Sequence, residues 1–276
     1  MSRGRYVEQA VWPKSFESRV RGWIVEPDQI APEELARLAD VPPAGSPLYD
    51  LPKMVSYVYA LRWNLARARS VEDISLGLAK AARPDVVLSY FQCPDSLPHR
   101  FWIFQKGLAA IERRLSQFGI DTSHAAELER RFGKVIERCY QDVDRRMGHL
   151  IDELAGPDTL VLVVSDHGFG DGPVPHPFKS EPYGGIHWST GVMLARTPGL
   201  DPRSEIRGAS VLDITPSILY FLGLAVAEDM RGKVIEALFQ GGPKQKIEPV
   251  STYEKKPQTE CPYAEGFPPK PESFIW

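Results

Sequence analysis

Five side chains that commonly bind divalent ions gather at three places in the chain. They are Asp95, His99, Asp166, His167 and His187. Carboxylates and neutral imidazoles suit Zn²⁺ or Mn²⁺, and five of them are enough to hold two ions. These residue types therefore predict divalent-metal chemistry, provided that the fold brings the three places together.

The segments beside these residues are typical of an α/β protein. Short β-branched or aromatic runs predict strands over 84–91, 159–165 and 191–195. Metal-binding residue types follow the first two strands and lie in the loop before the third. In open sheets, ligands bind outside the carboxyl ends of parallel strands. Since helical spacing alternates with the strands, we expect a largely parallel sheet. The helices are expected over 51–69, from Ser70 onward, over about 125–155, and over 213–223 with Asp213 as the N-cap.

Each group also fits a purely structural role. Asp95 is a good N-cap residue, so Asp95 and His99 fit a turn that begins a helix. Asp166 and His167 precede a glycine, as tight turns often do. His187 alone fits a hydrogen-bonded loop or core histidine. Their occurrence at three strand ends or adjoining loops, in sequence order, favours a shared metal site.

Two further sets of histidines have different expectations. His176 stands between Pro175 and Pro177 and is a candidate for substrate contact, with a rigid loop as the alternative. His124 and His149 occupy polar helical stretches, so we expect them to be solvated.

Composition excludes several classes of protein. A 43% hydrophobic content excludes wholesale disorder, and no apolar run approaches the roughly 18 to 20 residues of a membrane helix. With 33 Lys+Arg against 36 Asp+Glu, there is no basic excess for a nucleic-acid partner. The N-terminus lacks a secretory signal, which predicts a cytoplasmic protein by default. Cys93, Cys139 and Cys261 are widely spaced and are expected to be free thiols.

The chain divides into three predicted segments. Residues 1–50 have no strong period and predict an irregular connecting segment. Residues 51–240 carry the candidate ligands and form the main domain. Residues 241–276 are rich in proline and lysine and predict a tail. This tail fits either an arm that docks on a partner or on the domain, or a surface end without such a role.

The candidate ligands lie in motifs that resemble a known family. Val-Val-Ser-Asp-His-Gly-Phe at 163–169, Pro-Asp-Ser-Leu-Pro-His at 94–99 and Gly-Ile-His at 185–187 are similar to its metal-binding elements, and residues 213–223 and 229–232 to its closing segment. The family is the alkaline phosphatase superfamily, in its type I phosphodiesterase/nucleotide pyrophosphatase branch. The resemblance spans roughly residues 50–240. It implies a three-layer sandwich with a mostly parallel central sheet, incomplete at its N-terminal side.

The resemblance also implies a ligand set. Asp95, His99 and His187 would bind one divalent ion, and Asp166 and His167 would contribute to a second. Zinc is the expected metal, with manganese as the alternative. Two such ions promote in-line displacement at phosphorus, so the implied activity is hydrolysis of a small phosphate ester.

The earlier half of the family pattern is not recognisable. That half would supply an aspartate that completes the second metal site and a threonine or serine nucleophile. The first threonine, Thr122, follows the first metal motif, and Ser15 and Ser18 follow no predicted strand. We therefore identify no catalytic nucleophile.

Three interpretations remain. The chain is the C-terminal portion of a longer hydrolase whose other half must be supplied, or a weakened descendant that binds a metal or a phosphorylated ligand. The third interpretation is an interaction protein on the same fold.

Overall fold

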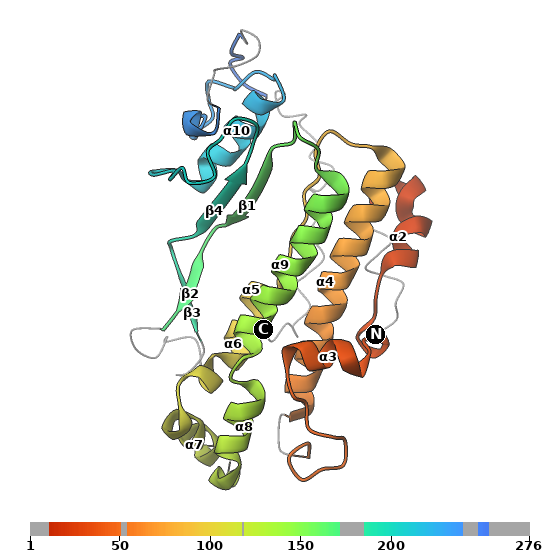
Figure 1. Cartoon of the computed structure of the whole chain (residues 1–276), viewed down its shortest axis with the longest axis vertical. Coiled ribbons are helices and arrows are strands. Elements are labelled where there is room, and N and C mark those ends of the chain that lie inside the picture. Colours follow the sequence, from red (N-terminus) through yellow and green to blue (C-terminus); the bar gives the residue numbers. More distant parts are fainter. Residues whose placement is uncertain (1–10, 51–53, 118, 172–184, 240–247, 254–276) are drawn as a thin grey trace, which may run out of the picture. The chain divides into compact units, whose positions relative to one another are not determined.

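The computed structural model describes residues 11–50, 54–117, 119–171, 185–239 and 248–253 (Figure 1). The chain forms two compact units. The first comprises residues 1–156 and 165–192, and the second comprises residues 157–164 and 193–276. All five predicted metal ligands belong to the first unit.

The two longest described helices of the first unit, α4 (Met54–Ala82) and α9 (Val135–Leu154), lie side by side (Figure 1). The buried residues of α9 recur every three or four positions, including Val135, Cys139 and Val143, which gives the helix one continuous inward stripe. This stripe joins a core that contains Leu61, Phe101 and other apolar side chains. The other α-helices in the described part of this unit are α2 (Glu17–Trp23), α3 (Pro32–Leu38), α5 (Cys93–Ser96), α6 (Pro98–Phe101), α7 (Leu108–Gln117) and α8 (Ala125–Phe132).

The predicted break at Ser70 is wrong, because α4 continues through it. The Ser70 hydroxyl donates to the Ala66 carbonyl one turn earlier, at 2.8 Å, and it also accepts from the Val25 amide at 2.8 Å. A serine that bonds back to its own helix can remain in the helix interior. Ser70 therefore attaches the chain after α2 to α4 and does not begin a second helix.

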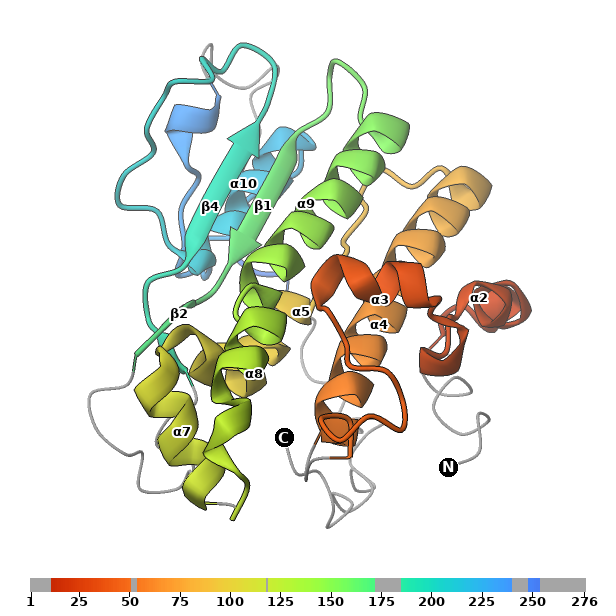
Figure 2. The ribbon, with the colours of Figure 1, turned by 60° about the horizontal axis from the view of Figure 1, so that its bottom comes forward.

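The described residues contain two small sheets. Strands β2 (Gly168–Gly170) and β3 (Ile186–Trp188) pair antiparallel in the first unit. Strands β1 (Val161–Ser165) and β4 (Val192–Arg196) form the other sheet, and Figure 2 draws them running in opposite directions. The mixture of helices and strands fits an α/β fold. The predicted parallel central sheet is not present in the described parts of the chain.

The sequence predicts β1 and β4 correctly to within two residues, but the predicted strand over 84–91 is wrong. The structure assigns no strand there, and the side chains of Val86, Val87, Leu88 and Tyr90 are exposed. Strand preference is expressed only when a neighbouring strand pairs with the backbone. Residues 84–90 have no such backbone partner among the described residues.

The second unit contains α10 (Ile214–Phe221), preceded by a 3₁₀ turn at Val211–Asp213. Asp213 does not cap α10 with its side chain. Its carboxylate instead accepts from the Lys233 and Ser210 amides, both at 2.8 Å. These two hydrogen bonds, that from Lys233 first, lower the pKa of the Asp213 carboxyl. Asp213 thus ties two separate stretches of the unit together.

No helix in the described ranges is long and apolar enough to cross a membrane.

Candidate metal site

Three of the predicted ligands converge on one point. The Nε2 atom of His187 lies 2.8 Å from Oδ1 of Asp95 and 2.9 Å from Nε2 of His99. The third side of the triangle, from His99 Nε2 to Asp95 Oδ1, is 3.3 Å. His187 lies 88 positions from His99 and 92 positions from Asp95 in the sequence, yet all three residues present their donor atoms to a single small volume.

The remaining two predicted ligands differ in how near they come. The imidazole of His167 stacks on that of His187, with ring centroids 3.8 Å apart, and its Nε2 lies 3.8 Å from Asp95 Oδ1. Asp166 is the outermost of the set. Its side chain is 79% exposed, and Oδ1 lies 3.8 Å from the Nε2 of His167. His167 thus adjoins the first three ligands, whereas Asp166 faces solvent.

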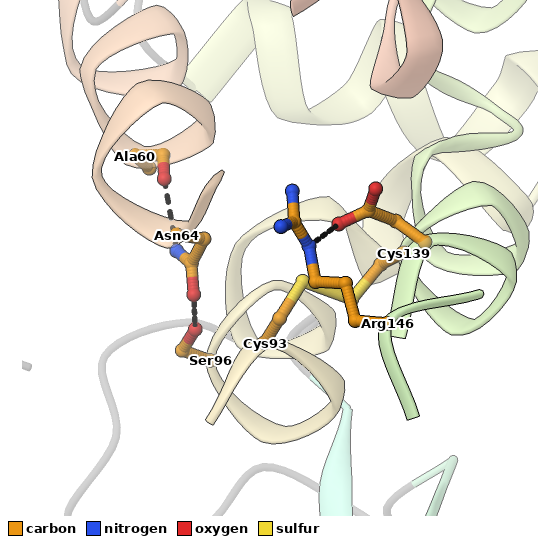
Figure 3. The surroundings of a disulfide bond; sticks show 7 residues. Ala60, Asn64, Cys93, Ser96, Cys139 and Arg146 are labelled. Carbon is orange, nitrogen blue, oxygen red and sulfur yellow. Dashed lines mark hydrogen bonds and ion pairs between the residues drawn. A yellow bond between two sulfur atoms is a disulfide. The ribbon is translucent and has the colours of Figure 1, made fainter. Parts of the chain in front are cut away.

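Asp95 is held in place because its short helix is attached on two sides. A disulfide joins Cys93 of α5 to Cys139 of α9, with Cα atoms 6.4 Å apart (Figure 3). On the other side, the Ser96 hydroxyl donates to Asn64 of α4, whose amide donates to the Ala60 carbonyl at 2.8 Å (Figure 3). A four-residue helix has little stability of its own, so these attachments fix Asp95 and begin the turn that leads to His99.

The disulfide corrects the prediction of free thiols at Cys93 and Cys139. The two residues are 46 positions apart in sequence, and only the packing of α5 on α9 brings them within bonding range. Both are buried in the core of the first unit.

The β2–β3 hairpin positions His187. In the antiparallel register, Phe169 is directly opposite His187, so both side chains lie on the face that carries the candidate site. Trp188 lies on the opposite face, where its indole occupies the space that a side chain at Gly170 would need: a Cβ there would lie 2.6 Å from the indole nitrogen. The Gly-Phe-Gly sequence of β2 therefore allows both faces to pack.

The donor set fits a divalent ion of the zinc type. Two imidazoles and one carboxylate are the ligands that zinc accepts, and donors of a tetrahedral zinc site stand about 3.3 Å apart for bonds of about 2.0 Å. The three separations in the triangle, 2.8, 2.9 and 3.3 Å, are at or a few tenths of an ångström below that value. Within the described residues, this trio is also the one cluster of at least three His, Cys, Asp or Glu side chains close enough to share an ion.

Two electrostatic features of this unit have no signal in the sequence. Asp171, which follows β2, accepts from the Trp102 indole at 2.6 Å and pairs with Lys106. Partial burial and, second, the negative charge of Asp95 raise the pKa of the Tyr140 phenol, which belongs to α9.

The other residues considered from sequence lie elsewhere. His176 lies outside the described residues. His149 is half-exposed and its Nδ1 lies 2.7 Å from a Glu72 carboxylate oxygen, so it is part of a buried charge network. His124 belongs to the turn before α8. The hydroxyls of Ser96 and Ser165, the serines nearest to the ligands in sequence, donate to Asn64 and to the His167 carbonyl.

Comparison with known proteins identifies one related family. The family model for type I phosphodiesterase/nucleotide pyrophosphatase matches residues 5–188, which is more than half of the chain. The matched range contains all five predicted ligands and extends back through the segment 1–50. No curated protein and no solved structure matches the chain significantly.

Proposed function

We propose that this chain, which belongs to the type I phosphodiesterase/nucleotide pyrophosphatase family, is a metal-dependent phosphoric ester hydrolase, or the metal-binding part of one. The observation that carries the proposal is the convergence of Asp95, His99 and His187, whose donor atoms lie 2.8 to 3.3 Å apart. Zinc is the metal best matched by two imidazoles and a carboxylate, with manganese as the alternative.

A divalent ion at this trio would supply charge neutralisation at the phosphoryl oxygens. The chain's own residues hold the donors in place. Asp95 provides the negative charge, and the attachments of α5 fix its position. His187 is placed opposite Phe169 by the hairpin.

A second ion would use Asp166 and His167. We propose this second set as incomplete, because zinc sites normally use at least three protein ligands and this set offers two. The family pattern also requires a Thr or Ser nucleophile, and the chain offers no candidate for it. We therefore propose that turnover by this chain alone is slow, and that a polypeptide carrying the N-terminal half of the pattern supplies the missing aspartate and nucleophile.

The substrate that we propose is a small phosphoric ester, not a nucleic acid. The formal net charge of −3 offers no basic excess to hold a polyanionic backbone.

One observation favours a second candidate function. The Asp166 side chain is 79% exposed and approaches His167 only to 3.8 Å. A protein with one formed metal site and one open set of ligands suits binding of a metal or of a phosphorylated ligand without turnover. An interaction protein that uses neither set is the remaining alternative.

Hydrolysis of bis(p-nitrophenyl) phosphate tests the proposal. The purified chain is stripped with a chelator and assayed after addition of Zn²⁺ or Mn²⁺, beside His187→Ala and the control His124→Ala. We expect slow cleavage that needs the metal, is lost in His187→Ala and is retained in His124→Ala. Zinc binding without cleavage would favour the binding module. Absence of both zinc binding and cleavage would overturn the hydrolase proposal and favour the interaction protein.

Two observations point to different locations of the protein in the cell. The sequence predicts a cytoplasmic protein, but disulfides persist mainly in oxidising compartments. In a cytoplasmic protein, Cys93 and Cys139 would be held as thiols despite their adjacency. Alkylation in intact cells before lysis distinguishes the two cases: labelled Cys93 and Cys139 support the cytoplasm, and unlabelled residues that become reactive only after reduction exclude a reducing compartment.

A further inference from the structure

We infer that Phe169 is a positioning residue that holds His99 and His187 in the geometry required for metal binding. Its ring lies edge-on to both imidazoles, with centroids 4.8 Å from His99 and 5.5 Å from His187 and interplanar angles of 76° and 65°. A single apolar side chain thus contacts two of the three converging ligands. This inference rests on the proposed function, because it assumes that these histidines bind a metal.

The position of the Phe169 ring is set from several sides. The β2–β3 register places Phe169 directly opposite His187, and side chains so paired have Cβ atoms about 4.5 to 5.5 Å apart. Trp102 contacts the ring from another direction, at a centroid distance of 5.5 Å. Gly185 closes a third side, since a Cβ atom there would lie only 1.9 Å from Cε1 of Phe169. The ring therefore has little freedom to leave the histidines.

The histidines need such support because solvent reaches them. The side chain of His187 is 46% exposed and that of His99 is partly exposed. An exposed imidazole can turn into water, and binding a metal then requires that this freedom be lost. Rings packed against Phe169 have already lost it, so more of the metal–ligand interaction appears as affinity. Groups that orient metal ligands typically change metal affinity by about 10- to 100-fold.

Phe169→Leu tests the inference by removing the ring while keeping an apolar side chain. We expect zinc to bind about 10-fold more weakly in isothermal titration. In the metal-free chain, we expect the imidazole NMR signals of His99 and His187 to broaden or to split into several conformers. This second measurement requires neither metal nor activity, so it isolates positioning from chemistry.

Gly185→Ala approaches the same contact from the other side. The added methyl group must displace the Phe169 ring, so we expect weaker zinc binding and the same disorder of the imidazole signals. In the double variant Phe169→Leu/Gly185→Ala the ring is already absent. If both substitutions act through Phe169, the double variant binds zinc as weakly as Phe169→Leu and no more weakly.

Tyr59→Leu is the matched control. It removes an aromatic ring of α4 that stacks on Trp63 at a centroid distance of 6.0 Å. We expect this variant to bind zinc as the unaltered chain does, and melting temperatures identify any variant that has simply lost its fold.

The outcomes separate the two proposals. If the unaltered chain binds zinc and Phe169→Leu binds it equally well with unchanged imidazole signals, the positioning role is wrong and the metal site stands. If additive losses appear in the double variant, the substitutions do not act through one contact and the inference is also wrong. If the unaltered chain binds no zinc, the proposed function fails first.

Discussion

Replacing Arg146 should destabilise the first unit more than replacing a surface charge does. Arg146 belongs to α9 and its side chain is only 4% exposed. Its guanidinium donates to Asp142 in the same helix, at 2.7 Å, and to Glu72 in α4. Burial disfavours the charge, but the hydrogen bonds and charges of these two carboxylates outweigh it and raise the Arg146 pKa.

The expected magnitude follows from what Arg146→Met leaves behind. Two buried carboxylates lose their common cation, and breaking a buried ion pair by removing one partner costs about 3 to 5 kcal/mol. Each carboxylate keeps one weaker partner, because His149 stays 2.7 Å from Glu72 and Arg145 stays 2.7 Å from Asp142. We therefore expect the lower end, about 3 kcal/mol. In a unit of this size, that loss lowers the melting temperature by roughly 6 to 12 °C.

Urea unfolding at pH 7 measures the effect, with Arg145→Met as the matched control. Arg145 is the neighbouring residue of α9, makes a hydrogen bond to Asp142 and has a side chain that is 49% exposed. We expect Arg145→Met to cost at most about 1 kcal/mol, because Arg145 is half-exposed and the buried Asp142 carboxylate keeps Arg146 as its partner. Equal losses in the two variants would refute the reasoning.

Three further predictions concern the backbone contacts and the disulfide. Gly232→Ala should destabilise the second unit by about 2 to 4 kcal/mol, because the new Cβ would lie 1.9 Å from the Leu212 carbonyl oxygen. Hydrogen exchange over residues 211–221 should become faster. Unchanged exchange there would show that the close approach is unimportant. Asp213→Asn should cost about 1 to 3 kcal/mol at pH 7, since one of two backbone donors loses its acceptor. Because the hydrogen bonds lower the pKa of Asp213, its contribution is present above about pH 4 and is lost as the pH falls through the lowered pKa. The melting temperatures of the two chains should therefore converge as the pH falls below about 4, and a difference that stays constant at acid pH would contradict this assignment. If Cys93 and Cys139 are bonded, alkylation of the denatured chain should label one cysteine without reduction and three after reduction, as counted by mass spectrometry. Three labels without reduction would disprove the bond.

The ligands of the candidate site could be chosen from sequence because residue type and local spacing carry that information. Asp95 and His99 are four apart, a spacing that places both side chains on one side of a helical turn. His187 is 88 residues from His99, and no periodicity links them. Its inclusion depended on the Gly-x-His motif, and the structure brings it to the other two through the β2–β3 hairpin.

The predictions that are wrong concern pairing and packing between distant segments. Residues 84–91 have the composition of a buried strand, yet no strand pairs with them in the described residues. Cys93 and Cys139 meet only because α5 lies on α9. Phe169 belongs to the Asp-His-Gly-Phe motif, but its contacts with two imidazoles depend on strand register and on the absence of a side chain at Gly185. Local sequence carries none of these relations.

Zinc titration tests the central claim most directly, namely that Asp95, His99 and His187 hold one divalent ion. Isothermal titration of the metal-free chain should give one tight site. His99→Ala should weaken that site by more than about 100-fold, since a direct ligand matters at least as much as a group that orients one. His124→Ala, which removes a histidine from the turn before α8, should leave it unchanged. Equal zinc affinity in His99→Ala and the unaltered chain, or no zinc binding by the unaltered chain, would contradict the assignment of this site.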